Sequence, residues 1–94
     1  KKTLSMIQEI RKVQLETETF VKNEMADIYS RELIELLFEQ PYCKISFLVD
    51  RHIAKKQTAS KYLNRLVTAG LLDKTKQGRE YYFINKNLWE ILTR

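Results

Sequence analysis

The stretch "IAKKQTASKYLNRLVTAGLL", residues 53–72, decides the fold of this chain. Its apolar residues recur at intervals of three and four, which predicts a helix with a single core-facing stripe. Gly70 ends the pattern at a position that favours a left-handed residue, and Leu71-Leu72 begins a strand. Lys55 and Lys56 stand in the first turn, where positive charge opposes the helix dipole and costs about 0.3–1 kcal/mol apiece. The two lysines therefore indicate a role other than helix stability.

This helix has two faces of different chemistry. The core-facing stripe consists of Ala59, Leu63, Leu66, Val67 and Gly70. The opposite face carries Gln57, Ser60, Lys61, Asn64 and Thr68. Amide, hydroxyl and ammonium groups on one exposed face are suited to hydrogen bonding with a polar ligand.

Periodicity predicts four more helices and one hairpin around this segment. A long amphipathic helix covers about residues 3–27, and a second runs from Ser30 to Gln40-Pro41. A short third helix over residues 45–51 should face inward with Ile45, Leu48 and Val49. The hairpin turns at Gln77-Gly78, and Tyr82 and Ile84 on its second strand should point inward. A last helix covers about residues 86–93, and Asn85 or Asn87 can cap it.

This order of elements is that of a winged helix-turn-helix. The predicted fold class is mainly α-helical with a small β-hairpin. Residues 1–28 form a long linker or dimerisation helix, and residues 29–94 form the winged helix-turn-helix domain. In such folds the helix after the turn enters the DNA major groove, and the hairpin, or wing, reaches a flanking backbone or minor groove.

Charge is distributed unevenly along the chain. Between residues 44 and 79 nine Lys or Arg face two Asp, a net of +7, whereas the first 43 residues carry a net of −2. A basic block in a chain that is otherwise balanced indicates a surface that meets phosphates. Gln57, Ser60, Lys61 and Asn64 are the residue types that read base edges. The predicted DNA-binding residues are Lys55, Lys56, Gln57, Ser60, Lys61, Asn64, Arg65, Lys74, Lys76 and Arg79.

An alternative remains open, because a winged helix can also serve as a protein-interaction or dimerisation module without binding DNA. Phe47, predicted to be exposed on the third helix, hints at such a protein contact. The long first helix adds a second hint, because its stripe of Met6, Ile10, Val13 and Phe20 exceeds what a small domain can bury. That stripe is expected to form a homodimer, or to pack on a neighbouring domain.

Other classes of function find little support in the sequence. No nucleophile with a base, paired carboxylates or phosphate-cradling loop can be picked out, so this segment is not expected to be an enzyme or to need a cofactor. His52 has no neighbouring ligands for a metal site, and Cys43 is expected to be a small buried side chain. A lone cysteine suits a reducing cytoplasm, and no apolar run is long enough to cross a membrane.

Three blocks in order, "YSRELIELLFEQPYCKI", "IAKKQTASKYLNRLVTAGLL" and "GREYYFIN", resemble the C-terminal region of long bacterial Fic/Doc family proteins. The resemblance implies a catalytic domain elsewhere in a longer parent, one that commonly transfers AMP to a target hydroxyl. The catalytic pattern of that family, His-Pro-Phe followed by Gly-Asn-Gly-Arg, does not occur here, because Ile53 follows His52. No catalytic residue is therefore carried over. His52 also stands where the family usually has Gly, which predicts some backbone strain.

Overall fold

The computed structural model describes residues 2–93, and their side chains from Ser5 onward. Five helices and three short strands make up this part of the chain. They are α1 (Lys2–Glu24), α2 (Arg31–Glu39), β1 (Tyr42–Cys43), α3 (Ile45–Asp50), α4 (Lys56–Thr68), β2 (Leu72–Gln77), β3 (Glu80–Asn85) and α5 (Lys86–Leu92). The predicted fold class, mainly helical with a small β-hairpin, is confirmed. None of the described helices is long and apolar enough to cross a bilayer.

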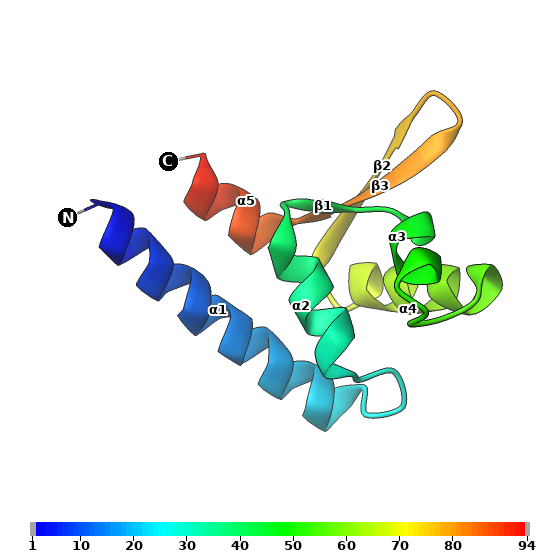
Figure 1. The fold of residues 1–94 in the computed structure, drawn as a ribbon, viewed down its shortest axis with the longest axis horizontal. Coiled ribbons are helices and arrows are strands. Elements are labelled where there is room, and N and C mark those ends of the chain that lie inside the picture. Colours follow the sequence, from blue (N-terminus) through cyan, green and yellow to red (C-terminus); the bar gives the residue numbers. More distant parts are fainter. Residues whose placement is uncertain (1, 94) are drawn as a thin grey trace.

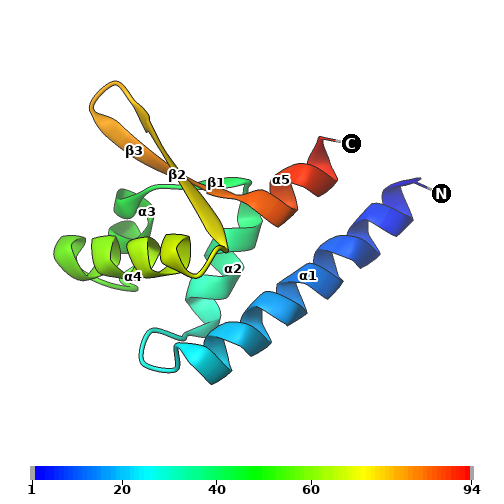
Figure 2. The same cartoon turned by 180° about the vertical axis from the view of Figure 1, so that it is seen from behind.

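The elements lie on two sides of α2. On one side α5 packs along α1, and on the other lie α3, α4 and the β2–β3 hairpin, which projects away from α1 (Figures 1 and 2). The hairpin is the wing named below, residues 72–85. The two sides of the molecule therefore present different surfaces to a partner.

One core joins α2, α3, α4 and the hairpin. Leu33, Leu37, Leu48, Leu63 and Leu66 are almost completely buried in it, as the sequence predicts. The C-terminal half of α1 also reaches this core through the buried side chain of Val21, and the segment after α1 reaches it through Met25. The proposed domain boundary at residue 28 stays a prediction.

Local signals in the sequence explain where α2 and α5 begin. The Ser30 hydroxyl accepts a hydrogen bond from the Leu33 amide over 3.1 Å and caps α2. Asn85 caps α5 in the same way, accepting from the Leu88 amide over 3.2 Å. The Asn85 amide nitrogen also donates to the Leu37 carbonyl over 3.0 Å, so one buried side chain joins β3, α2 and α5.

Three positions outside regular elements have left-handed backbone: His52, Gly70 and Gly78 in the hairpin loop. Gly70 has φ of +86° after the end of α4, as predicted for a helix-terminating glycine. His52, in the turn between α3 and α4, has φ of +59°. A left-handed histidine is less favourable than a glycine, so the predicted strain at this turn is present.

The hairpin differs from the prediction by one residue. Its two-residue loop is Gly78-Arg79 rather than Gln77-Gly78, since Gln77 pairs with Glu80. The buried apolar side chain of β3 is Phe83, whereas Tyr82 and Ile84 are only half-buried, so their predicted inward orientation is wrong. A one-residue change of register exchanges the two faces of a strand. The run "EYYFIN" is apolar on both faces, and its sequence cannot indicate which face is buried.

Two predictions on α3 are also wrong. Val49 was expected in the core but is 37% exposed, whereas Phe47 was expected to be exposed but is half-buried against the core. The helix has only six residues, and its inward face is centred on Leu48. The short strand β1, which was not predicted, precedes α3 and pairs with β3. The Phe47 ring contacts the ring of Tyr42 in β1, and their centroids are 5.9 Å apart.

Candidate functional site

The basic residues of the sequence gather on α4 and the wing. α4 begins without a side-chain cap. Lys56 is its first helical residue, and Lys55 is the N-cap residue. Lys55 therefore lies just before the first turn, in which it was expected. The first turn contains no acidic side chain, and Lys55, Lys56 and Gln57 are all exposed. The free amides of a helix N-terminus and two ammonium groups thus share one exposed end.

The outer face of α4 forms an open hollow. Ser60, Lys61, Asn64, Arg65 and Thr68 line it. Four of these five residues were predicted to bind DNA, so the structure brings them together. Lys61 is exposed, whereas Ser60 and Asn64 are half-buried and their side chains lie 3.3 Å apart.

Asn64 is already engaged in this free state. Its amide nitrogen donates to the Ser60 carbonyl over 2.8 Å, and its amide oxygen accepts a hydrogen bond of 3.0 Å from Lys74 of β2. Reading a base edge would require Asn64 to exchange these partners. Lys74 in turn lies 4.4 Å from the centroid of the Tyr81 ring, so its ammonium is held between helix and wing.

Arg65 is directed toward the opposite side of the hollow. It forms an ion pair of 2.5 Å with Asp27, in the loop between α1 and α2. The hydrogen bond from Arg65 lowers the pKa of Asp27 and raises the pKa of Arg65. Both side chains are substantially exposed, so solvent screens the pair, and Arg65 can be exchanged to another anion at small cost.

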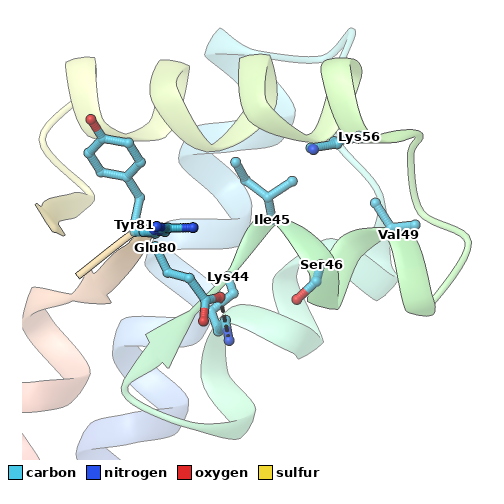
Figure 3. Close-up of a pocket in the computed structure, with 8 residues that line it drawn as sticks. Lys44, Ile45, Ser46, Val49, Lys56, Glu80 and Tyr81 are labelled. Atoms are coloured by element: carbon cyan, nitrogen blue, oxygen red, sulfur yellow. Dashed lines mark ion pairs between the residues drawn. The ribbon is translucent and has the colours of Figure 1, made fainter. Parts of the chain in front are cut away.

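A cleft of about 460 Å³ separates the wing from α3 and the start of α4 (Figure 3). Lys56 and Arg79, both predicted to bind DNA, line this cleft together. Lys44 lines it as well, and an ion pair of 2.6 Å joins Lys44 to Glu80. The hydrogen bond to Glu80 raises the pKa of Lys44 above its ordinary value, so Lys44 stays positively charged.

Sequence reasoning did not assign Lys44, Glu80 or Tyr81 to the site. Lys44 counted toward the basic block, but only the pairing of β1 with β3 places it beside Glu80. A two-residue strand leaves no recognisable pattern in a sequence, which is why this side of the site was missed.

Six predicted residues are positively charged and make no ion pair with any residue in the described range 2–93. They are Lys55, Lys56, Lys61, Lys74, Lys76 and Arg79. All six belong to the start and outer face of α4 or to the wing. Their charges are therefore available to an anionic partner on the side of the molecule away from α1.

Among residues 2–93, no group of three or more His, Cys, Asp or Glu side chains is placed to hold a metal ion. Cys43 is buried, as expected, and burial raises the pKa of its thiol to about 12. A thiol with that pKa is a poor nucleophile at neutral pH.

The predicted dimerisation stripe lies on the other side of the molecule. Met6, Ile10 and Val13 of α1 are half-buried, and Phe20 is 39% exposed. On α5, Trp89 is the single aromatic residue and is 50% exposed. The side bearing α1 and α5 thus keeps apolar surface in contact with solvent.

Comparison with known families gives one finding for this chain. Residues 13–88 match the family model described as the C-terminal domain of SoFic-like protein adenylyltransferase. The matched range begins within α1 and ends within α5, so it includes the whole basic surface.

Proposed function

Because the chain belongs to the family of SoFic-like protein adenylyltransferase C-terminal domains, we propose that it is the DNA-binding module that targets or regulates a Fic-type enzyme. In this proposal α4 is the recognition helix of a winged helix-turn-helix and lies in the major groove of double-stranded DNA. The wing contacts the adjacent backbone. The catalytic domain, which would transfer AMP, lies elsewhere in the parent protein, and this segment is itself not an enzyme.

The observation that carries this proposal is the set of six positively charged side chains on α4 and the wing that have no acidic partner among residues 2–93. DNA presents a dense row of phosphates, and binding is favoured when Lys and Arg neutralise them and release counterions. Lys55 and Lys56, which oppose the dipole of α4, would meet a phosphate together with its free amides. Charges that disfavour the free helix would then stabilise the complex.

The residues on the outer face of α4 have the chemistry for reading bases. Lys61 and Gln57 are exposed and can reach a base edge without losing a partner in the protein. Ser60 and Asn64 are tied to each other, so they would contribute after exchanging partners. Lys76 and Arg79 on the wing, and Arg65 after release from Asp27, would hold the backbone.

The test is a nuclear magnetic resonance titration of the isotope-labelled chain with a random-sequence duplex of about two helical turns. We expect amide shifts at residues 55–68 and 74–80 and none in α1 or α5. Shifts confined to α1 and α5, or no shifts at low salt, would contradict the proposal.

A second candidate function is homodimerisation through the α1 and α5 side, favoured by the exposure of Phe20 and Trp89. Partly exposed aromatic side chains on adjoining helices invite association. A dimer joined there would leave both recognition helices free, because α4 lies on the other side of the molecule (Figures 1 and 2). The Fic-type domain of the parent could instead cover the same stripe.

Light scattering distinguishes these possibilities. A dimer should dissociate in the double variant Phe20→Glu/Trp89→Glu. Leu15→Glu is the matched control, since Leu15 is 63% exposed on α1 and lies well away from the Phe20 side of the helix. A wild-type chain that stays monomeric at high concentration would contradict the dimer and leave the parent's own domain as the partner.

A further inference from the structure

The cleft between α3 and the wing combines apolar walls with positive charge. Ile45 and Val49 of α3 and Tyr81 of β3 form its walls, and Lys44, Lys56 and Arg79 add three cations. Glu80 is the one acidic residue among those that line it. In Figure 3, Lys44 and Glu80 lie at one end of the cleft, and Lys56 lies at the other end, near Val49.

This mixture matches the chemistry of a sugar-phosphate backbone. A DNA strand presents deoxyribose faces, which are largely apolar, in alternation with phosphates, which carry full negative charge. Three cations against one carboxylate make the cleft electrostatically complementary to such a strand. Cations at its two ends suit successive phosphates of one strand better than a single compact anion.

Lys44 is more restrained than its acidic partner. The Lys44 side chain is 23% exposed, whereas that of Glu80 is 56% exposed. Lys44 also lies 5.4 Å from the centroid of the Tyr82 ring, which holds the ammonium from another direction. Glu80 can therefore turn into solvent while Lys44 stays in place, and an entering phosphate would leave Lys44 paired throughout.

We propose that this cleft binds one strand of the DNA backbone, and that Glu80 occupies, in the free protein, the place beside Lys44 that a phosphate takes in the complex. The proposal rests on the DNA-binding function proposed above and adds two residues to it. Lys44 becomes a phosphate contact, and Glu80 becomes an internal competitor that weakens binding. The wing then approaches DNA only where a backbone phosphate can replace the carboxylate.

The test compares two pairs of variants in fluorescence anisotropy titrations with duplex DNA. Glu80→Gln should tighten binding about threefold, the scale of one exposed ion pair. The slope of log K against log salt should change little, because Lys44 meets one phosphate in both proteins and the released counterion comes from the DNA. Lys44→Gln should weaken binding about threefold or more.

The ion pair of 3.8 Å between Lys86 and Asp73 supplies matched controls. Asp73→Asn and Lys86→Gln make the same charge changes at residues that do not line the cleft. Both should bind DNA nearly as the wild type does. Thermal unfolding of all four variants checks that each is folded, and Glu80→Gln and Lys44→Gln test the cleft independently.

The outcomes separate this inference from the proposed function. If the wild type binds DNA but each cleft variant behaves as its control does, Lys44 and Glu80 are not part of the interface and the inference is wrong. If Glu80→Gln differs from its control but Lys44→Gln does not, Lys44 does not contact a phosphate, which also overturns the inference. If no protein binds DNA at low salt, the proposed function fails and this inference fails with it.

Discussion

Lys74 of the wing donates a hydrogen bond of 3.0 Å to Asn64 on the outer face of α4. This hydrogen bond joins β2 to α4, because β2 folds back along that helix. Because Asn64 also donates to the Ser60 carbonyl over 2.8 Å, the Lys74 ammonium is linked through Asn64 to the backbone of α4. The wing is thus linked to α4 before any partner binds.

Replacing Asn64 should loosen the wing. Asn64→Ala removes the acceptor for Lys74, and we expect faster motion of residues 74–79 in nitrogen relaxation measurements. The free energy of unfolding should fall by about 0.5–1.5 kcal/mol, the usual net value of a hydrogen bond. Thr68→Ala is the control, since the Thr68 hydroxyl donates to the backbone carbonyl of Asn64, whereas Lys74 bonds the Asn64 side chain. An equal effect of both variants would show that the helix, and not the link to Lys74, responds.

Which face of β3 points into the core can be tested by truncating two neighbouring side chains of the strand. Phe83 is fully buried, so Phe83→Ala should lower the free energy of unfolding by about 3–5 kcal/mol. Tyr82 is half-buried against Tyr42, with ring centroids 5.8 Å apart. Tyr82→Ala should therefore cost less than half as much. Chemical denaturation measures both values, and a larger loss for Tyr82→Ala would reverse the assigned faces.

Substitutions at two left-handed positions, Gly70 and His52, should change the free energy of unfolding in opposite directions. Gly70 has φ of +86° and open space where a Cβ atom would lie, so Gly70→Ala should cost about 1–2 kcal/mol through backbone conformation alone. His52 has φ of +59°, and His52→Gly should raise stability by up to about 1 kcal/mol. Urea unfolding of both variants checks the pair. Destabilisation by His52→Gly would mean that the imidazole makes a contribution larger than the strain.

The buried thiol predicts a specific loss of stability in alkali. The folded pKa of Cys43 is raised to about 12 by burial, whereas a thiol in an unfolded chain ionises near about 8.5. The unfolded state therefore loses its proton first, and stability should decline as the pH rises from about 9 toward 12. Between about pH 8 and 10 the wild type should lose about 2 kcal/mol more than Cys43→Ala. Equal losses in both proteins would show that Cys43 does not titrate on unfolding.

Much of the fold could be predicted because its signals are local. The stripe of Ala59, Leu63 and Leu66 and the left-handed Gly70 define α4, and Ser30 and Asn85 mark the starts of α2 and α5. Each of these signals acts within a few residues. The order of the helices and the hairpin then follows directly, and with it the fold class.

The parts that could not be predicted depend on contacts between distant segments. The pairing of β1 with β3 involves two residues of β1, too few to show a period, yet it brings Lys44 to Glu80. Likewise Arg65 and Asp27 meet across the loop that follows α1, and nothing near either residue indicates the other. The candidate site was therefore predicted on α4 and the wing, but not on its Lys44 side.

The most direct test of the central claim is the salt dependence of binding to random duplex DNA. If the positively charged residues of α4 and the wing meet phosphates, log K should fall linearly with log salt at about 0.9 per contact, and several contacts give a slope of about −3 or steeper. Lys61→Gln should make that slope shallower by up to about 1, whereas Lys12→Gln on α1 should leave it unchanged. A slope near zero, or no binding at the lowest salt, would contradict the account and favour a protein partner.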